Sequence, residues 1–599
     1  MVAALAIALT TGLLALAQQA AAAPVRIHDI QGRSRISPLN GQTVSSVPGI
    51  VTGVRSYGSS KGFWIQDPQP DDDPATSEGI FVYTQSAPSV TVGDSVIVAG
   101  LVTEYYPGGS RSGVQSVTTI TKPTVTVHSS GNPLPAPLVL HDRDIPEAYA
   151  PTPPAGAGGN IESLPLEPKK YALDLYESLE GMRVEVDDAR VVGPTSKYHD
   201  LWVTAKPSQN PTPRGGTIYT GYDSPNSGRI KVQSLIPGST QPFPQASTGD
   251  ELAGATVGPL DYDQYGGYTI EATSLGALKS GGIKPQIARK QLTDELALAT
   301  YNVENLAPGD SDTKFARLAT GIVTNLASPD IVALEEIQDN DGATDDGVVA
   351  ADKTVQKFVD AIKAVGGPSY DWRSIAPQND ADGGQPGGNI RQVLLFNSAR
   401  VSFTDIPGGD ATTPVGLTTV DGKVRLTASP GRMAPQDAAW KKSRKPLVGQ
   451  FSFRGRTIFV IANHFDAKLG DQGLDSRFQP PTRSSEVQRL EQSRIENDFV
   501  KKLLAADARA QVVALGDLND YQFSPAVQAL MAGDVLRDLI DTLPTNQRYS
   551  YVYDGNSQLL DHILVSPAIQ HADYEVVHIN AEFAHQTSDH DPQVVRIQP

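Results

Sequence analysis

The sequence contains no cysteine among its 599 residues. This absence excludes disulfide frameworks, thiolate metal sites and cysteine nucleophiles. Positive charge is also scarce, because 49 basic side chains face 67 acidic ones and leave a formal net charge of −18. Such a balance argues against a nonspecific basic sheath for nucleic acid, although it says little about the charge of one cleft. After the first residues no apolar run approaches the ~18 residues of a membrane span, so we expect no membrane anchor.

The first residues instead have the pattern of a secretion signal. An uncharged run at 3–17 is followed by small residues at 20–23 and then Pro24, the order of an apolar region and an A-x-A cleavage site. The usual charged start is missing, because Arg26 is the first charged residue, which leaves room for a true start further upstream. We expect residues 1–23 to be removed and the protein to be secreted into the extracellular space. A buried N-terminal helix is the alternative.

The length and the distribution of Gly and Pro predict several domains, since single cores stop growing at ~250–300 residues. Residues 24–125 alternate short apolar runs with turn residues, which predicts a small all-β barrel or sandwich. A Pro/Gly-rich linker at 126–170 leads to a second β domain at 171–280, and a short basic linker covers 281–294. Both β segments carry a glycine-led strand, a turn and a tryptophan-bearing strand, so we interpret them as a degenerate repeat.

The pattern changes in residues 295–599. Apolar strands such as 296–303 alternate with segments whose apolar residues fall at helical spacing, for example Phe315, Leu318 and Ile322. Mixed strands and helices over ~300 residues predict a layered α/β domain.

Polar side chains cluster where the apolar strands of this domain start or stop. Strands that bring acids, amides and histidines to one rim would build an oxygen-rich site, which suits Mg²⁺, Mn²⁺ or Ca²⁺ and disfavours tightly bound zinc. Each motif alone is more often a surface turn or a structural residue, but six in order beside strands favour a catalytic site. The six motifs are Asn302-Val303-Glu304-Asn305, Leu334-Glu335-Glu336, Asn463-His464, Gly516-Asp517-Leu518-Asn519, Leu560-Asp561-His562 and Ser588-Asp589-His590-Asp591-Pro592.

This ordered set resembles the endonuclease/exonuclease/phosphatase superfamily, whose members include deoxyribonuclease I and apurinic endonucleases. The stretches 384–391 and 443–448 look like its secreted bacterial nuclease branch. Residues 26–32 and 62–68 resemble OB-fold-like modules found beside such nucleases. The resemblance implies a multidomain protein in which N-terminal all-β, OB-like modules precede a C-terminal four-layer α/β sandwich.

The resemblance also implies roles for individual residues. His590 would be the general base that deprotonates water, oriented by Asp561, because a carboxylate fixes the imidazole tautomer and stabilises the imidazolium. Asp517 and Asn519 would hold the attacking water or the scissile phosphate, and His464 would donate to a phosphoryl oxygen. The divalent metal, Mg²⁺ or Mn²⁺ with Ca²⁺ as an alternative, would be bound by Asn302, Glu304, Glu336 and Asp589. The residues expected to contact phosphate or DNA are Arg444, Lys441, Lys442, Lys445 and Arg391.

One departure limits the comparison. In deoxyribonuclease I an arginine two residues after the metal-binding glutamate reaches into the minor groove, and Gln338 occupies that position here. Groove contact and cutting preference therefore cannot be carried over.

Three surface features have two interpretations each. Six basic residues between 441 and 456 would form a phosphate-contact patch or a solvated edge hairpin. The acidic loop at 67–78 would bind Ca²⁺ or form a plain solvated turn. The aromatic residues of the first β segment would stack bases or belong to the core. These aromatic residues are Phe63, Trp64, Tyr83, Tyr105 and Tyr106.

The leading hypothesis is a secreted, monomeric, metal-dependent nuclease. It would hydrolyse phosphodiester bonds of extracellular DNA, or RNA as well, by in-line attack of activated water. The alternative within the superfamily is a secreted hydrolase of phospholipids or nucleotide phosphates. A binding or matrix protein with an inactive catalytic domain is disfavoured, because every catalytic position is filled.

Overall fold

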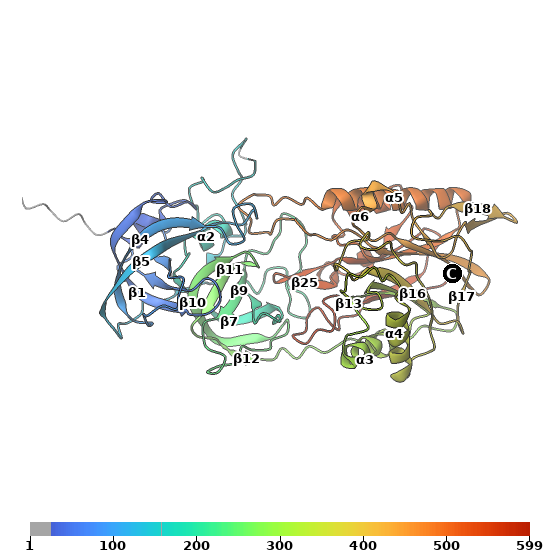
Figure 1. Cartoon of the computed structure of the whole chain (residues 1–599), viewed down its shortest axis with the longest axis horizontal. Helices are drawn as coiled ribbons and strands as arrows, with labels where there is room; N and C mark the ends of the chain where they lie inside the picture. Colours follow the sequence, from blue (N-terminus) through green and yellow to red (C-terminus); the bar gives the residue numbers. More distant parts are fainter. Residues whose placement is uncertain (1–24, 157) are drawn as a thin grey trace, which may run out of the picture.

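The structure is a computed structural model that describes residues 25–156 and 158–599. The segment expected to be a secretion signal, 1–23, lies outside the described residues. Figure 1 shows a β-rich N-terminal lobe beside a C-terminal lobe in which helices flank sheets. Within the described part of the chain, no helix is long and apolar enough to cross a membrane.

The first domain is a closed five-stranded barrel. Its strands follow the order β1-β2-β3-β5-β4, with β3 and β5 parallel and the other pairs antiparallel. Inward and outward positions alternate along β4, where Val96, Val98 and Val102 are buried in the barrel core. The elements are α1 (Ile27–Gln31), β1 (Thr43–Arg55), β2 (Gly62–Gln66), β3 (Gly79–Tyr83), β4 (Ser95–Tyr105) and β5 (Val117–Ser129).

The second domain repeats this topology. β7 pairs with both β8 and β10, which closes strands β7, β8, β9, β11 and β10 into a ring. The third and fifth strands of the ring, β9 and β11, are again the parallel pair. The shared strand order agrees with the repeat expected from the sequence. The elements are β6 (Leu138–Val139), η1 (Asp142–Asp144), α2 (Ala172–Glu177), β7 (Arg183–Gly193), β8 (Leu201–Thr204), β9 (Arg229–Ser234), β10 (Glu251–Asp263), β11 (Gly267–Ala272) and β12 (Ala277–Lys279).

The stretch expected to be a linker, 126–170, begins inside strand β5 of the first barrel, which runs to Ser129, and its later part packs on the second barrel. Strand β6 pairs with β7, and Leu140, Ile145 and Ile161 are buried in the core of this barrel. Apolar residues spaced between the prolines fix the stretch in place, although prolines prevent regular secondary structure.

The C-terminal domain contains two sheets packed face to face. One sheet has the order β15-β16-β14-β13-β29-β28, and the other runs β17-β21-β22-β23-β27-β24 with β20 beside β21. The first sheet consists of β13 (Leu296–Leu306), β14 (Ile331–Ile337), β15 (Asp371–Arg373), β16 (Arg391–Phe396), β28 (Ala572–Val576) and β29 (Gln593–Ile597). The second consists of β17 (Ser402–Phe403), β20 (Gly431–Arg432), β21 (Leu447–Phe453), β22 (Arg456–His464), β23 (Gln511–Asp517), β24 (Arg537–Asp538) and β27 (Asp561–Val565).

Helices cover the outer face of each sheet, which gives the four-layer arrangement expected from the sequence. Leu298 of β13 and Val460 of β22 share the core between the sheets. Helices α3 and α4 bury Phe315 and Phe358 against the first sheet, and α5 and α6 cover the second (Figure 1). The helices are α3 (Asp312–Thr320), α4 (Asp352–Ala364), α5 (Glu486–Ala506) and α6 (Pro525–Met531).

Short elements complete the domain. The π-helical turn η2 (Gly321–Asn325) follows α3, and the 3-10 turns are η3 (Ala438–Trp440), η4 (Leu539–Thr542) and η5 (Thr545–Gln547). Two hairpins lie outside the sheets: β18 (Leu417–Val420) with β19 (Lys423–Leu426), and β25 (Tyr551–Tyr553) with β26 (Asn556–Gln558).

Candidate active site

The carboxyl ends of the central strands meet at one rim of the sandwich. β13 is parallel to β14 in one sheet, and β22 is parallel to β23 in the other, so each pair delivers its last residues to the same edge. The amide of Asn302 donates to Glu336 Oε1 at 3.1 Å and to Asp517 Oδ2 at 3.2 Å. These two bonds join residues of both sheets into one site.

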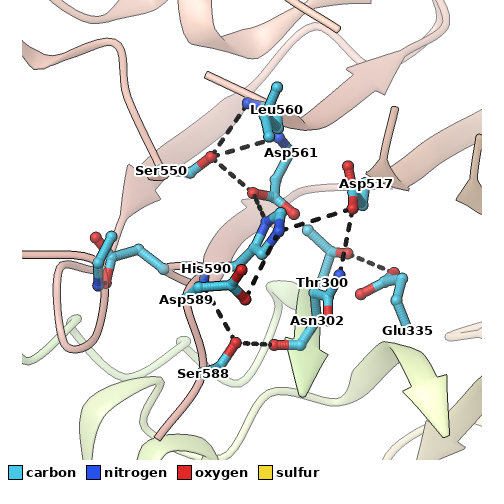
Figure 2. Close-up of polar contacts among 12 residues, drawn as sticks. Thr300, Asn302, Glu335, Asp517, Ser550, Leu560, Asp561, Ser588, Asp589 and His590 are labelled. Atoms are coloured by element: carbon cyan, nitrogen blue, oxygen red, sulfur yellow. Dashed lines mark hydrogen bonds and ion pairs between the residues drawn. The ribbon is translucent and has the colours of Figure 1, made fainter. Parts of the chain in front are cut away.

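His590 and Asp561 form the hydrogen-bonded pair that the sequence analysis expects, a general base and the carboxylate that orients it. His590 Nδ1 lies 2.8 Å from Asp561 Oδ2, and the Ser550 hydroxyl donates to the same carboxylate oxygen at 2.7 Å (Figure 2). The other ring nitrogen, Nε2, faces the rim, 3.8 Å from Asp517 Oδ2 and 4.0 Å from Asp589 Oδ1. Asp561 therefore fixes the ring and leaves Nε2 available to accept a proton.

The electrostatics of His590 are dominated by its neighbours. Burial alone would lower its pKa, but the carboxylates of Asp561, Asp517 and Asp589 raise the pKa well above the ordinary value. A cation held by those carboxylates opposes this effect, so deprotonation of His590 and cation binding are linked.

His464 has the opposite character. Burial, and then the positive charges of Arg444 and His590, lower its pKa well below the ordinary value. Its Nε2 lies 3.6 Å from Asp517 Oδ2 and 3.8 Å from Glu336 Oε1. A neutral imidazole in this position can donate a hydrogen bond to an oxygen without titrating at physiological pH.

Carboxylates outnumber cations at the rim. Burial, and then the charges of Asp589 and Glu336, raise the pKa of Glu304 to about 7, while Lys314 and Lys197 act in the other direction. Lys197 belongs to the turn between β7 and β8, so positive charge of the second barrel contributes to the electrostatics of Glu304.

The donor set fits a divalent cation. Glu304, Glu336, Asp517, Asp589 and the amide of Asn302 offer oxygen atoms, and their mutual repulsion is relieved by added positive charge. Asp517, Asp561 and His590 also bring one ligand atom each to within 4.8 Å of one another. Oxygen-rich donors without thiolates are those of Mg²⁺ and Mn²⁺ sites.

The backbone is strained around these side chains. Glu304, Asn305, Glu336 and Asn519 all have positive φ, between 49° and 62°. Non-glycine residues adopt this region rarely, and such residues cluster at functional sites. The sharp turns aim the ends of β13 and β14 and the residues after β23 into the rim.

The residues expected to contact the phosphate form two groups, one at or beneath the rim and one on the exposed surface. The Asn519 amide donates to Phe465 O at 3.2 Å and lies beside Asp517, and the guanidinium of Arg444 is buried beneath the site, where it donates to Phe465 O. Lys441 and Lys442 are exposed and precede β21.

Three of the expected DNA contacts are buried side chains: Arg444, described above, and also Arg391 and Lys445. Arg391 is 2% exposed and donates to the carbonyls of Val349 and Asn389, and Lys445 is held by Asp382 in a buried ion pair. Both sit in or beside apolar strands, where a charged side chain must find partners inside the protein.

The six basic residues between 441 and 456 do not form one patch. Arg454 and Arg456 lie at the turn between β21 and β22, at the opposite end of β22 from His464. Nine residues of strand separate them from the rim by roughly 25 Å, given ~3.3 Å per residue. These two arginines therefore occupy a solvated hairpin, the alternative that the sequence left open.

The acidic loop and the aromatic residues of the first barrel have defined contacts. Arg26 pairs with Asp67, and Glu78 lies 3.1 Å from His28 Nδ1. His28, Asp67 and Glu78 also bring one ligand atom each to within 4.8 Å of one another, so cation binding by this loop stays a prediction. Phe63 and Trp64 are buried, whereas Tyr105 is half exposed.

Sequence reasoning missed the hairpin β25–β26. Tyr551 pairs with His590 across an isolated bridge, and the two rings lie 4.8 Å apart. Tyr553 continues the stack at 6.3 Å, with its ring nearly parallel to that of Tyr551. The only available signal was the Tyr-x-Tyr alternation beside a turn, because strands of three residues leave a weak pattern.

Comparison with known proteins identifies the domain that carries this site. Residues 299–590 match the model of the Endonuclease/Exonuclease/phosphatase family. The C-terminal domain belongs to this family. It is accordingly a domain of metal-dependent phosphoesterases, which agrees with the carboxylate and histidine set at the rim. Residues 139–280, the second barrel with the stretch before it, match a domain of unknown function.

Solved structures resemble the family domain at low identity. The human nocturnin catalytic domain with a bound sulfate anion is 13% identical, covering 51% of this chain and 95% of its own, with a TM-score of 0.34. D. rerio TDP2 in complex with a single-strand DNA product is 16% identical, covering 51% and 99%, at 0.31. A family protein from Bacteroides thetaiotaomicron is 17% identical, covering 51% and 94%, also at 0.31. No curated protein matches the chain.

Proposed function

We propose that the protein is a secreted, divalent-metal-dependent nuclease that hydrolyses phosphodiester bonds of extracellular DNA, with RNA as an alternative substrate. The observation that carries the hydrolytic part is the Asp561–His590 pair, which holds an imidazole nitrogen toward a rim of metal-binding carboxylates. When bound, the metal supplies charge stabilisation for the phosphorane transition state and its leaving oxygen.

The protein side chains have separate tasks in this reaction. His590 Nε2 accepts the proton of water, and Asp561 stabilises the imidazolium that forms. Neutral His464 donates to a phosphoryl oxygen, and the buried Arg444 lowers the energy of the negative charge that accumulates there. The attack is in line and leaves no covalent enzyme intermediate.

A nucleic acid is favoured as substrate by the surroundings of His590. The ring of Tyr553 is 54% exposed and stacks on Tyr551, which in turn packs on His590. Aromatic faces beside a cleavage site stack nucleobases irrespective of sequence. Exposed Lys441 and Lys442 supply positive charge for a phosphate backbone.

We also infer that both barrels are OB-fold-like modules. Support comes from the strand order, in which the first strand pairs with the second and fourth, and the third with the fifth in parallel. Secretion is supported by the sequence pattern of residues 1–23.

The test is a substrate panel with the purified full-length chain. Plasmid DNA, single-stranded DNA, RNA and phosphatidylcholine vesicles are incubated with Mg²⁺, Mn²⁺, Ca²⁺ or EDTA, with the His590→Ala variant in parallel. We expect metal-dependent cleavage of nucleic acid by the parent and not by the variant. Intact nucleic acid in every metal, together with hydrolysis of the phospholipid, would refute the nuclease and favour a lipid phosphodiesterase.

A further inference from the structure

A large cavity lies between the two barrels, away from the active site. Its volume is about 660 Å³, within the range of small-molecule binding sites. The first barrel contributes β3, β5, the β1–β2 loop and the β4–β5 loop, and the second contributes β9, β10, β11 and the turn at 264–265. The catalytic reaction proposed above uses none of these residues.

Tyrosine faces form the walls of this cavity. Tyr57, Tyr105 and Tyr265 are 50%, 51% and 71% exposed, and Tyr83 lies beside them. Three exposed tyrosines around one hollow are unusual, because aromatic side chains contribute most when they are covered. Tyr57, Tyr83 and Tyr105 come from the β1–β2 loop and the ends of β3 and β4 in the first barrel, and Tyr265 comes from a turn of the second, so the arrangement exists only when the barrels are joined.

The floor of the cavity is a network of buried charge. Arg55 donates to Asp261 at 2.6 Å and to Glu271 at 2.7 Å, and its guanidinium lies 4.6 Å above the Trp64 ring. The side chain of Glu271 is 2% exposed, and its second oxygen, Oε2, has no hydrogen-bond partner among the described residues. A buried carboxylate oxygen without a donor is costly, so this atom is prepared to accept a hydrogen bond from a ligand.

The charge of the cavity disfavours a phosphate backbone. The carboxylates of Glu104, Asp261, Asp263 and Glu271 line it, whereas the only cations at these groups in the described structure are Arg55 and Lys231. These carboxylates would repel a phosphate group placed in the cavity, and the low dielectric of a recess strengthens this repulsion. Because Arg55 and Lys231 already pair with three of the four carboxylates, a cationic ligand would also find few free partners.

We propose that this cavity binds a neutral oligosaccharide. The apolar faces of sugar rings pack on tyrosine, and sugar hydroxyls provide donors for Glu271 Oε2 and for the hydroxyl oxygens of Thr119 and Thr121. The protons of these two threonine hydroxyls are already donated to Thr103 O and Leu101 O. Barrels of this strand order present the face between the β1–β2 and β4–β5 loops to such chains. The binding would attach the enzyme to a glycan-containing surface while the active site remains free.

The experiment is calorimetric titration of the full chain, in EDTA, with maltohexaose, cellohexaose and the fully N-acetylated chitohexaose, which are all neutral. The competing chemistries are represented by dT12 and spermine. We expect saturable binding of at least one neutral hexasaccharide, weakened at least about tenfold in a Tyr105→Ala/Tyr265→Ala double variant. Tyr198→Ala removes a tyrosine that is 73% exposed outside the cavity, and it should bind as the parent does.

Two outcomes would overturn the proposal. One is the absence of saturable binding for all three sugars. The other is binding of dT12 or spermine that the double variant abolishes and Tyr198→Ala retains. Cleavage of a short DNA duplex by the double variant should equal that of the parent, so failure of the sugar site and failure of the nuclease proposal are separable.

Discussion

At the scale of single residues, the site contains two histidines with opposite electrostatics. Burial would lower the pKa of His590, but the surrounding carboxylates raise it, whereas burial and then nearby positive charge lower the pKa of His464. Titratable groups whose environments push their pKa values apart identify the acid–base roles in a site. In the proposed reaction His590 is thus the group that takes a proton, and His464 the one that remains a neutral donor.

Replacement of the base tests this assignment. We expect His590→Ala to lower kcat on DNA by a factor on the order of 10²–10⁴, the usual contribution of a general base. The melting temperature should change little, because Asp561 keeps its bond to Ser550. His585→Ala alters an exposed histidine five residues earlier and serves as the control. Full activity of His590→Ala would remove His590 from the mechanism.

The carboxylate of Glu336 can be tested without turnover. Glu336 Oε1 and Oε2 accept from Asn302 and Asn305, which holds both oxygens at the rim. Glu336→Gln should weaken Mg²⁺ binding at least about tenfold in a calorimetric titration, because one charged oxygen donor is lost. Glu491→Gln, on the exposed face of α5, should leave the titration unchanged. Equal affinity in both variants would place the metal elsewhere.

At the scale of elements, the strand ends could be predicted from sequence and the packing of charged residues could not. Apolar runs followed by Asn302, Glu336, His464 and Asp517 mark the rim because a strand inside two layers has only its ends for polar residues. Arg391 also stands at the end of an apolar strand, but its guanidinium donates to the backbone carbonyls of Val349 and Asn389 inside the protein. Sequence spacing does not reveal which carbonyls lie within reach of a guanidinium.

The hairpin β25–β26 shows what only the structure provides. At the start of the hairpin, Tyr551 packs on His590. At its tip, residues of the second barrel form two hydrogen bonds. Arg229 donates to Asp554 O at 2.6 Å, and the Asn226 amide donates to Asn556 Oδ1 at 2.7 Å. Figure 1 places β25 between the two lobes. The second barrel therefore supports an element that packs on His590, the proposed base.

Substitution of Tyr551 tests this support. Tyr551→Ala removes the ring that packs on His590 and should lower kcat about tenfold, because small displacements of a base have large effects on rate. Tyr551→Phe keeps the ring and should restore kcat to near the parent value. If Tyr551 had only a structural role, the alanine variant would lose activity only because part of it is unfolded. The measurement is kcat of Tyr551→Ala at a temperature well below its melting transition, where the variant is folded. A reduced kcat there indicates that Tyr551 positions His590, and an unchanged kcat indicates a structural role alone.

At the scale of the whole molecule, a loop of the catalytic domain binds both barrels together. The backbone of Arg477 donates to Gly113 O at 3.0 Å, and its guanidinium covers the Tyr106 ring at 4.7 Å. The carbonyl of Asp475 accepts from Gln115 of the first barrel and Tyr262 of the second. Such shared polar contacts join the lobes, so we expect one cooperative thermal transition rather than separate transitions for each domain.

Asp475 makes the joint sensitive to pH. Burial, and then the charge of Asp554, raise its pKa to about 8, and its carboxylate accepts from the Tyr149 hydroxyl. In the unfolded chain an aspartate titrates near ~4, so between about pH 4 and pH 8 the folded protein binds more protons than the unfolded one. Stability is consequently lost as pH rises through this range.

Asp475→Asn should abolish that loss, because the amide is neutral at every pH and keeps an oxygen that accepts from Tyr149. The gain in melting temperature over the parent should be small at pH 5 and several degrees at pH 8, measured by differential scanning calorimetry. Asp498→Asn, on the exposed surface of α5, should show no such pH-dependent difference. If Asp475→Asn gave the same gain at both pH values, ionisation of Asp475 would not be what weakens the joint between the lobes at high pH.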